Sequence, residues 1–174
     1  NIVHNPPSIE KLKEAEIRLK YEELFEFMFK INYLREQHKN EKTGIKRNIT
    51  EDDVNKFLNM VPFELTSDQI NTINEIKNDF NSSSRMNRII QGDVGSGKTI
   101  VAIASMYINY LSGYQSALMA PTEILAIQHY NNVKDLFKDT GINVELLVGS
   151  QTKKEKQSIY KELENGNINI VIGT

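Results

Sequence analysis

The chain has 174 residues, of which 39% are hydrophobic, and this is enough apolar material for one ordinary core plus an extension. Its net charge of −2 excludes a protein that binds nucleic acid over a broadly basic surface, so any such contact must come from particular loops and helix ends. The chain has no cysteine, which excludes disulfides and thiolate metal sites, and no apolar run approaches the roughly 18 residues of a membrane helix.

The first predicted element is a long helix. Two prolines followed by Ser8 form a stop-and-start signal, and the helix begins at Ile9 and continues without Pro or Gly to about His38. Its second half, residues 24–34, is apolar nearly all round, so it must be covered on more than one side. Either a segment outside this sequence or the rest of this chain would supply the cover, and the pattern leaves both alternatives open.

A polar, mostly basic stretch follows at residues 38–48. Such a run is usually a solvated loop, and a contact with a DNA backbone is the alternative. Thr50 and the acids after it then predict the start of a short helix, which Pro62 ends. Thr66 or Ser67 caps the next helix, whose apolar face has isoleucines at positions 70, 73 and 76.

Beyond the polar run Asn81–Ser84, which ends that helix, short apolar runs alternate with helical patterns. The predicted elements are strand 88–91, helix 98–111, strand 115–120, helix 123–138, strand 143–148, helix 152–165 and strand 168–173. Strands separated by helices of this length predict right-handed βαβ units. We therefore expect an α/β fold with a mainly parallel sheet, preceded by the long N-terminal helix and a short helical segment.

One stretch after the first of these strands fits G-x-x-x-x-G-K-[ST] at every fixed position. It reads Gly92-Asp93-Val94-Gly95-Ser96-Gly97-Lys98-Thr99. The apolar pair Ile89-Ile90 precedes it and an apolar helical pattern follows it, which is the context that this phosphate-binding motif requires. We expect the loop at the carboxyl end of its strand, where open α/β sheets bind ligands.

The residue types of this loop suit a polyphosphate. We expect Gly92, Gly95 and Gly97 to adopt positive φ, so that main-chain N–H groups can point closely at phosphate oxygens. The helix that begins near Lys98 adds its free N–H groups and the positive end of its dipole. Lys98 would be the cation for the β and γ phosphates of ATP, and the Thr99 hydroxyl would ligate the bridging Mg²⁺.

Three blocks around the loop carry a family resemblance. Phe63-x-Leu65-Thr66-x-x-Gln69 resembles the glutamine motif of superfamily-2 helicases, residues 119–129 (MAPTEILAIQH) resemble motif Ia, and residues 171–174 (VIGT) resemble the start of the next DNA-contacting motif. Together with the phosphate loop, these blocks are most similar to the RecG-type ATP-dependent DNA helicases. The resemblance covers nearly the whole chain, strongly over residues 63–174 and more weakly over residues 6–62.

The resemblance implies a division of the chain. Residues 1–62 would be the helical linker from the wedge region to the motor, and residues 63–174 the N-terminal part of RecA-like helicase lobe 1. Phe63 and Gln69 would contact adenine, and the Gln69 amide can donate and accept at once, which suits the N6 and N7 edge of that base. A plain surface glutamine is the alternative.

The resemblance also implies DNA contacts at four residues, which are Pro121, Thr122, Gly173 and Thr174. Pro121 and Thr122 end a strand and start a helix, so main-chain N–H groups there can hold a phosphate, with the Thr122 hydroxyl as a further donor. A simple N-cap at Thr122 and an ordinary strand end at Gly173 are the alternatives.

An acidic box is missing from the sequence. RecG-type motors have a Walker B motif beyond the segment that resembles residues 171–174, whereas Asp93 lies in the loop and Asp135 and Asp139 lie on a predicted helix. Without that carboxylate and the arginine of a second lobe, little rate enhancement would remain, so we expect these residues alone not to hydrolyse ATP. Because the sequence opens without Met and closes on a strand pattern, we expect a piece of a longer protein.

The function expected of that longer protein is ATP-dependent remodelling of replication forks and Holliday junctions in DNA recombination and repair. The resemblance implies a monomer in the bacterial cytoplasm, with the wedge and the second motor lobe in the same polypeptide and no membrane partner. Two alternatives are the motor of a transcription-repair coupling translocase and a P-loop module that binds nucleotide without hydrolysis. A P-loop kinase of small molecules has no support, because residues 120–129 fit DNA contacts better than an acceptor site.

Overall fold

The computed structural model describes residues 4–40 and 44–174, and contacts divide the chain into two compact units, residues 1–43 and 44–174. The described part of the first unit is dominated by α1 (Ile9–Asn40). As predicted, Ser8 caps this helix, since its Oγ accepts a hydrogen bond from the Lys11 N–H at 3.3 Å. No helix among the described residues is long and apolar enough to cross a membrane.

The apolar half of α1 carries a ladder of aromatic rings. Tyr21, Phe25, Phe29 and Tyr33 follow one another at four-residue steps, and successive ring centroids lie 6.0, 6.2 and 6.4 Å apart. All four side chains are more than half exposed. That this half of α1 is covered on more than one side stays a prediction.

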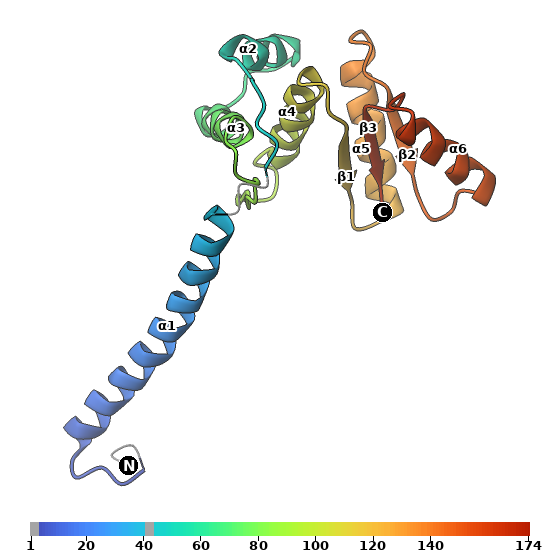
Figure 1. The fold of residues 1–174 in the computed structure, drawn as a ribbon. Coiled ribbons are helices and arrows are strands. Elements are labelled where there is room, and N and C mark those ends of the chain that lie inside the picture. The colour runs from blue at the N-terminus through green and yellow to red at the C-terminus, as the bar shows by residue number, and fades with distance from the viewer. Residues whose placement is uncertain (1–3, 41–43) are drawn as a thin grey trace. The chain divides into compact units, whose positions relative to one another are not determined.

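The second unit has the expected α/β class. Its elements are α2 (Glu51–Met60), α3 (Ser67–Phe80), α4 (Lys98–Leu111), β1 (Ser116–Met119), α5 (Glu123–Phe137), β2 (Val144–Leu147), α6 (Lys153–Glu164) and β3 (Ile170–Gly173). The three strands are parallel and lie in the order β1-β3-β2, so β3 is central (Figure 1). Helix α5 packs across β2 and β3, α4 contacts β1, and α2 and α3 pack on α4.

A chain of aromatic rings joins the helices of this unit. Tyr107 of α4 lies between Phe57 of α2 and Phe137 of α5, with both pairs of ring centroids 5.7 Å apart. Phe57 and Phe137 are almost completely buried, and truncating such a residue to alanine typically costs about 3–5 kcal/mol. Helix α4 is therefore packed through Tyr107 against both α2 and α5.

The strand predicted at residues 88–91 is wrong. No strand is formed there, and the Ile89 side chain is 91% exposed. A strand needs hydrogen-bonding partners, and no strand in the described part of the chain pairs with these residues. The phosphate-loop sequence therefore does not follow a strand of its own. The other elements predicted with bounds, from the helix at Ile9 to the strand ending at residue 173, are found with ends shifted by no more than about two residues.

The basic stretch at residues 38–48 lies partly outside the described residues, which exclude 41–43. Within the described part, Arg47 is held rather than solvated. Its guanidinium carbon lies 4.4 Å from the ring centroid of Phe80 and 4.9 Å from that of Tyr114. Its main-chain N–H also donates to the Phe80 carbonyl at 2.9 Å. Arg47 itself is therefore attached to the end of α3.

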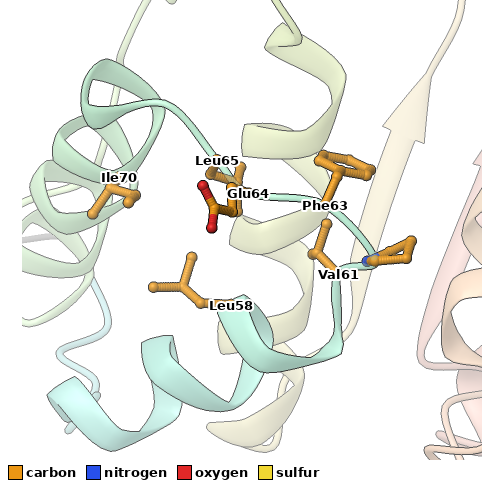
Figure 2. Close-up of a pocket in the computed structure, with 7 residues that line it drawn as sticks. Leu58, Val61, Phe63, Glu64, Leu65 and Ile70 are labelled. Atoms are coloured by element: carbon orange, nitrogen blue, oxygen red, sulfur yellow. The ribbon is translucent and has the colours of Figure 1, made fainter.

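A cavity of about 520 Å³ lies where α2 ends and α3 begins (Figure 2). Its lining is mainly apolar, with one carboxylate, that of Glu64. The lining residues are Leu58, Val61, Pro62, Phe63, Glu64, Leu65 and Ile70. Phe63, which we predicted to contact adenine, is thus a wall of this cavity and is 57% exposed.

Candidate functional site

In the glycine-rich loop at residues 92–99, two of the three glycines have the positive φ that lets main-chain N–H groups turn toward a bound anion. Gly95 and Gly97 have φ of 86° and 77°, as predicted, and few other residues adopt this region. Gly92 does not have positive φ, so that part of the prediction is wrong. A Cβ at Gly92 would lie 2.7 Å from the Ser96 Oγ, so a larger residue here would require the Ser96 side chain to move, whereas the backbone conformation itself does not require glycine.

The loop opens onto a helix that has no side-chain cap. Gly97 is the N-cap of α4 and makes no capping hydrogen bond, and the first turn of α4 holds no acidic residue. The other helices of this unit, α2, α3, α5 and α6, each begin at a threonine whose hydroxyl accepts a main-chain N–H, and each has an acid in its first turn. The first N–H groups and the dipole of α4 are therefore left to attract an external anion.

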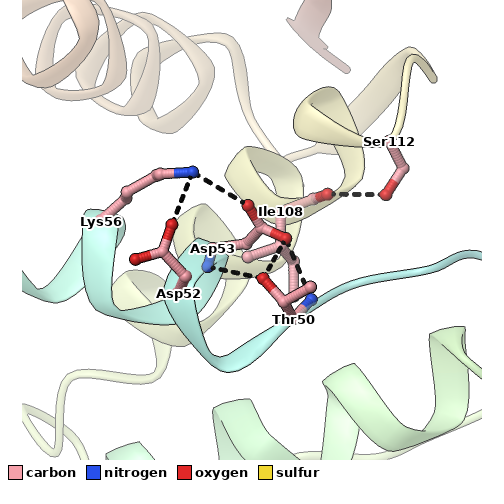
Figure 3. A network of polar contacts seen from close by, with 6 residues as sticks. All are labelled: Thr50, Asp52, Asp53, Lys56, Ile108 and Ser112. Atoms are coloured by element: carbon pink, nitrogen blue, oxygen red, sulfur yellow. Dashed lines mark hydrogen bonds and ion pairs between the residues drawn. The ribbon is translucent and has the colours of Figure 1, made fainter.

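The start of α2 shows what α4 lacks (Figure 3). The Thr50 Oγ1 accepts the Asp53 N–H, and the Asp53 carboxylate accepts the Thr50 N–H at 2.9 Å and pairs with Lys56 at 3.3 Å. The hydrogen bond from the Thr50 main chain lowers the pKa of Asp53 below its ordinary value. At α2 the N-terminal charge is compensated by the protein itself.

Lys98 reaches back across the loop. Its Nζ donates to the carbonyl oxygens of Gly92 at 2.8 Å and Asp93 at 2.7 Å. Both partners are neutral, so an anionic phosphate oxygen would be a stronger acceptor for the same ammonium group. Thr99, the predicted Mg²⁺ ligand, is exposed, and Val94 at the tip of the loop is fully exposed.

Gln69, at the start of α3, contacts the loop directly. Its Oε1 accepts the Thr66 N–H at 2.9 Å, which completes a capping box, and its Nε2 donates to the Ser96 carbonyl at 3.0 Å. A Cβ at Gly97 would collide with this Nε2, which is a second reason for glycine there. One lone pair and one N–H of the amide remain for a ligand. Phe63 belongs to the cavity of Figure 2, whose lining includes neither Gln69 nor the loop.

The four residues predicted to contact DNA gather at one edge of the sheet. Met119 is the register partner of Gly173, and the Ala120 N–H donates to the Gly173 carbonyl at 2.8 Å, so the ends of β1 and β3 lie side by side. Thr174 and the pair Pro121–Thr122 are exposed there. A Cβ at Gly173 would collide with the Leu147 carbonyl, so the packing of β2 on β3 also requires this glycine.

Nothing in the sequence indicated that the Glu123 carboxylate links the start of α5 to the loop after β2. The Glu123 Oε1, in the first turn of α5, accepts the Ser150 N–H of the loop after β2 at 2.8 Å, and hydrogen bonding to Ser150 lowers the pKa of Glu123. The Thr122 hydroxyl caps α5 by accepting the Leu125 N–H at 3.4 Å. Its own O–H stays available as a donor.

Sequence reasoning also gave no role to Arg88. This side chain lies against α3, where its Nε bonds Asp79 at 2.8 Å and its Nη1 pairs with Glu75. Hydrogen bonding to Asp79 raises the pKa of Arg88. The available signal was the spacing of the two acids, because residues four apart share one face of a helix and two carboxylates there favour a cation.

Residues 66–174 match the family model of the DEAD/DEAH box helicases, and the chain belongs to this family. Membership implies a nucleotide-binding protein. Within the family, the chain is 44% identical over 174 residues to the ATP-dependent DNA helicase RecG of Staphylococcus aureus strain NCTC 8325 and 41% identical over 172 residues to RecG of Bacillus subtilis strain 168. These alignments cover 100% and 99% of the chain, which confirms the resemblance to the RecG-type helicases.

A solved structure of RecG bound to a three-way DNA junction matches 96% of the chain with a TM-score of 0.84 and 42% identity, which confirms the RecA-like fold. The chain covers 23% of that structure and 25% of the two bacterial relatives. It therefore spans about a quarter of the length of the proteins that it resembles.

Proposed function

We propose that this chain is the linker and the first part of motor lobe 1 of a RecG-type, ATP-dependent DNA helicase, with the division at residues 62 and 63. The observation that carries this proposal is the uncapped start of α4, placed behind a loop with two positive-φ glycines in a chain of the DEAD/DEAH box helicase family. No other described helix of this unit leaves its first N–H groups without a threonine cap.

The residues of the loop fit a triphosphate and its magnesium ion. Main-chain N–H groups between Gly92 and Thr99 would hold phosphate oxygens, and Lys98 would exchange the carbonyls of Gly92 and Asp93 for the β and γ phosphates. The exposed Thr99 hydroxyl would ligate Mg²⁺, which neutralises charge on the phosphates when bound. Asp93, Val94 and Ser96 supply main chain to the same cradle.

The base would be held by the glutamine motif. Gln69 already touches the loop through Ser96 and keeps one donor and one acceptor for adenine. Phe63 offers an exposed ring at the cavity of Figure 2, against which an aromatic base can pack.

DNA would lie at the carboxyl edge of the sheet. The segments Pro121–Thr122 and Gly173–Thr174 would contact the phosphate backbone through the Thr122 N–H and the hydroxyls of Thr122 and Thr174, and such contacts position a duplex without reading its sequence. The relatives that match the full chain are named DNA helicases, and one solved relative is bound to a three-way junction. We therefore infer that forked and branched DNA is the substrate of the full-length polypeptide, in recombination and repair.

In the full-length polypeptide, a wedge region and a second motor lobe would complete this site, and ATP hydrolysis between the lobes would drive branched DNA past the wedge. We expect a monomer in the bacterial cytoplasm. RecG matches that cover the whole chain favour this proposal over a transcription-repair coupling translocase. A P-loop module that never hydrolyses nucleotide is disfavoured by membership of a helicase family.

The test is Lys98→Ala in the full-length polypeptide. Removal of one preorganised charge at a reacting phosphate costs about 10²–10³-fold in kcat, so ATPase activity should be lost. Binding to a three-way junction, measured by fluorescence anisotropy without nucleotide, should be unchanged, because the proposed DNA contacts lie at residues 121–122 and 173–174 and not in the loop. Equal loss of both activities would contradict the proposed separation of sites. The 174 residues alone should show no turnover, and a rate like that of the full-length polypeptide would refute this expectation.

A further inference from the structure

Arg88 binds two acids on one face of α3. Its Nε lies 2.8 Å from the Asp79 Oδ2, and its Nη1 pairs with the Glu75 carboxylate. The Arg88 and Asp79 side chains are 30% and 33% exposed and are partly withdrawn from water, whereas the Glu75 side chain is 59% exposed. A guanidinium has donors in a fixed fork, and two carboxylates on successive turns of a helix hold that fork in a fixed place.

The N-terminal end of α3 contacts the chain eight residues after Arg88, at Ser96. Gln69, in the first turn of α3, donates to the Ser96 carbonyl at 3.0 Å. Residues 88–96 are therefore fastened to α3 at both ends, by an ion-pair cluster at Arg88 and by an amide at Ser96. Between these two points the chain forms no strand and is largely exposed.

Helix α3 is itself fixed in the core. Ile73 and Ile76 on its inner face are 1% and 2% exposed, and the helix packs on α4, which begins where the loop ends. The loop is thus held between two helices that are packed against each other. Two contacts set its starting point, which are the ion pairs of Arg88 with α3 and the packing of Ile90 against the hydrophobic core.

We propose that Arg88 is a positioning residue for the nucleotide site, and that its pairing with Asp79 and Glu75 holds the 92–99 loop in a binding-ready shape. This inference rests on the proposed ATP site. Preorganisation of a loop raises affinity because the ligand no longer has to order it. Loss of the cluster should therefore weaken nucleotide binding although Arg88 itself touches no phosphate.

The test is a charge swap in the full-length polypeptide, read by equilibrium binding of a fluorescent ATP analogue with Mg²⁺. Arg88→Asp and Asp79→Arg should each weaken binding by about tenfold, which corresponds to about 1.4 kcal/mol. The double variant should recover to within about threefold, because an arginine at position 79 can pair with both Glu75 and an aspartate at position 88. Arg18→Gln, which breaks an exposed pair with Glu22 on α1, is the matched control and should change nothing.

A second readout needs no nucleotide. Hydrogen–deuterium exchange of peptides covering residues 88–97 should be faster in both single variants and restored in the double variant. Arg88→Lys should keep the fold and bind nucleotide with intermediate affinity, since one ammonium replaces a two-donor fork. This variant keeps the test decisive if Arg88→Asp does not fold.

Two results would overturn the inference. One is wild-type affinity and wild-type exchange in folded Arg88→Lys and Asp79→Arg proteins. The other is a double variant that is no better than either single variant. A wild-type protein whose analogue binding is insensitive to Lys98→Ala would instead overturn the proposed ATP site, and the exchange rates of residues 88–97 would still decide the role of Arg88.

Discussion

The first turns of α4 and α6 are built from opposite chemistry. Helix α6 begins at Thr152 in a capping box, in which the Glu155 carboxylate accepts the Thr152 N–H at 2.7 Å and the Thr152 hydroxyl accepts the Glu155 N–H. Helix α4 begins at Gly97, with neither a capping side chain nor an acid in its first turn. The N–H groups at the start of α6 are hydrogen-bonded within the protein, whereas those at the start of α4 remain available to a ligand. This difference marks the proposed nucleotide site.

The largest expected effect comes from filling the space at the start of α4. Gly97→Ala forces an unfavourable φ and collides with the Gln69 amide, so the cradle should be displaced and affinity for a fluorescent ATP analogue should fall at least about tenfold. Gly113→Ala, just beyond the end of the same helix, is the matched control. Its φ is 83° and nothing would meet the added Cβ, so it should lower stability without changing nucleotide affinity. Equal effects on binding would show that general strain, not the cradle, is responsible.

A smaller effect is expected at Gly92, where an added Cβ meets only the end of the Ser96 side chain, at 2.7 Å. Gly92→Ala should weaken nucleotide binding by several-fold, and Ser96→Ala in the same protein should restore most of it, because the hydroxyl is the clashing group. Isothermal titration of the three variants measures this coupling. Additive losses in the double variant would contradict the steric explanation.

Two threonine caps, Thr122 on α5 and Thr152 on α6, are expected to differ in their effect on DNA binding. Thr122→Ala and Thr152→Ala should each lower the free energy of unfolding by about 1 kcal/mol, because each removes an N-cap. Only Thr122→Ala should also weaken binding to a DNA junction, since Thr122 lies at the proposed DNA edge. Chemical unfolding and fluorescence anisotropy separate the two effects. A DNA defect of the same size in Thr152→Ala would remove the reason for assigning that edge.

The smallest effect concerns pH. Hydrogen bonding from the Thr152 hydroxyl lowers the pKa of Glu155, so the folded state binds a proton there less readily than the unfolded state. The resulting stabilisation is present above the ordinary glutamate pKa of about 4.3 and is lost as the pH falls through the lowered value. Unfolding measured between about pH 2 and 7 should be less pH-dependent in Glu155→Gln. An unchanged pH profile in that variant would contradict the capping role.

Local signals explain what could be predicted from the sequence. The cap at Ser8 and the start of α4 at Lys98 depend on residues within a few positions, and both were found as expected. For α3, the structure selects Thr66 from the two expected caps, Thr66 and Ser67. The strand at 88–91 failed because pairing is decided by distant strands, which a two-residue apolar run does not specify.

The contacts around the loop were harder to predict for the same reason. Gln69 lies 27 residues before Ser96, and only a family resemblance brought it to the site. Arg88 pairs with Asp79 nine residues and Glu75 thirteen residues before it, across the turn that ends α3. The constraint on Gly92 comes from a neighbouring side chain that its motif does not name.

Whether the main chain of residues 92–99 binds the phosphates can be measured by hydrogen–deuterium exchange of the full-length polypeptide, with and without saturating Mg²⁺-ATP. We expect slower exchange in peptides covering residues 92–100, where main-chain N–H groups would bind phosphate, and no change at the capped first turns of α2 and α6. Unchanged exchange at residues 92–100 in a protein that demonstrably binds the nucleotide would contradict the assignment of this loop.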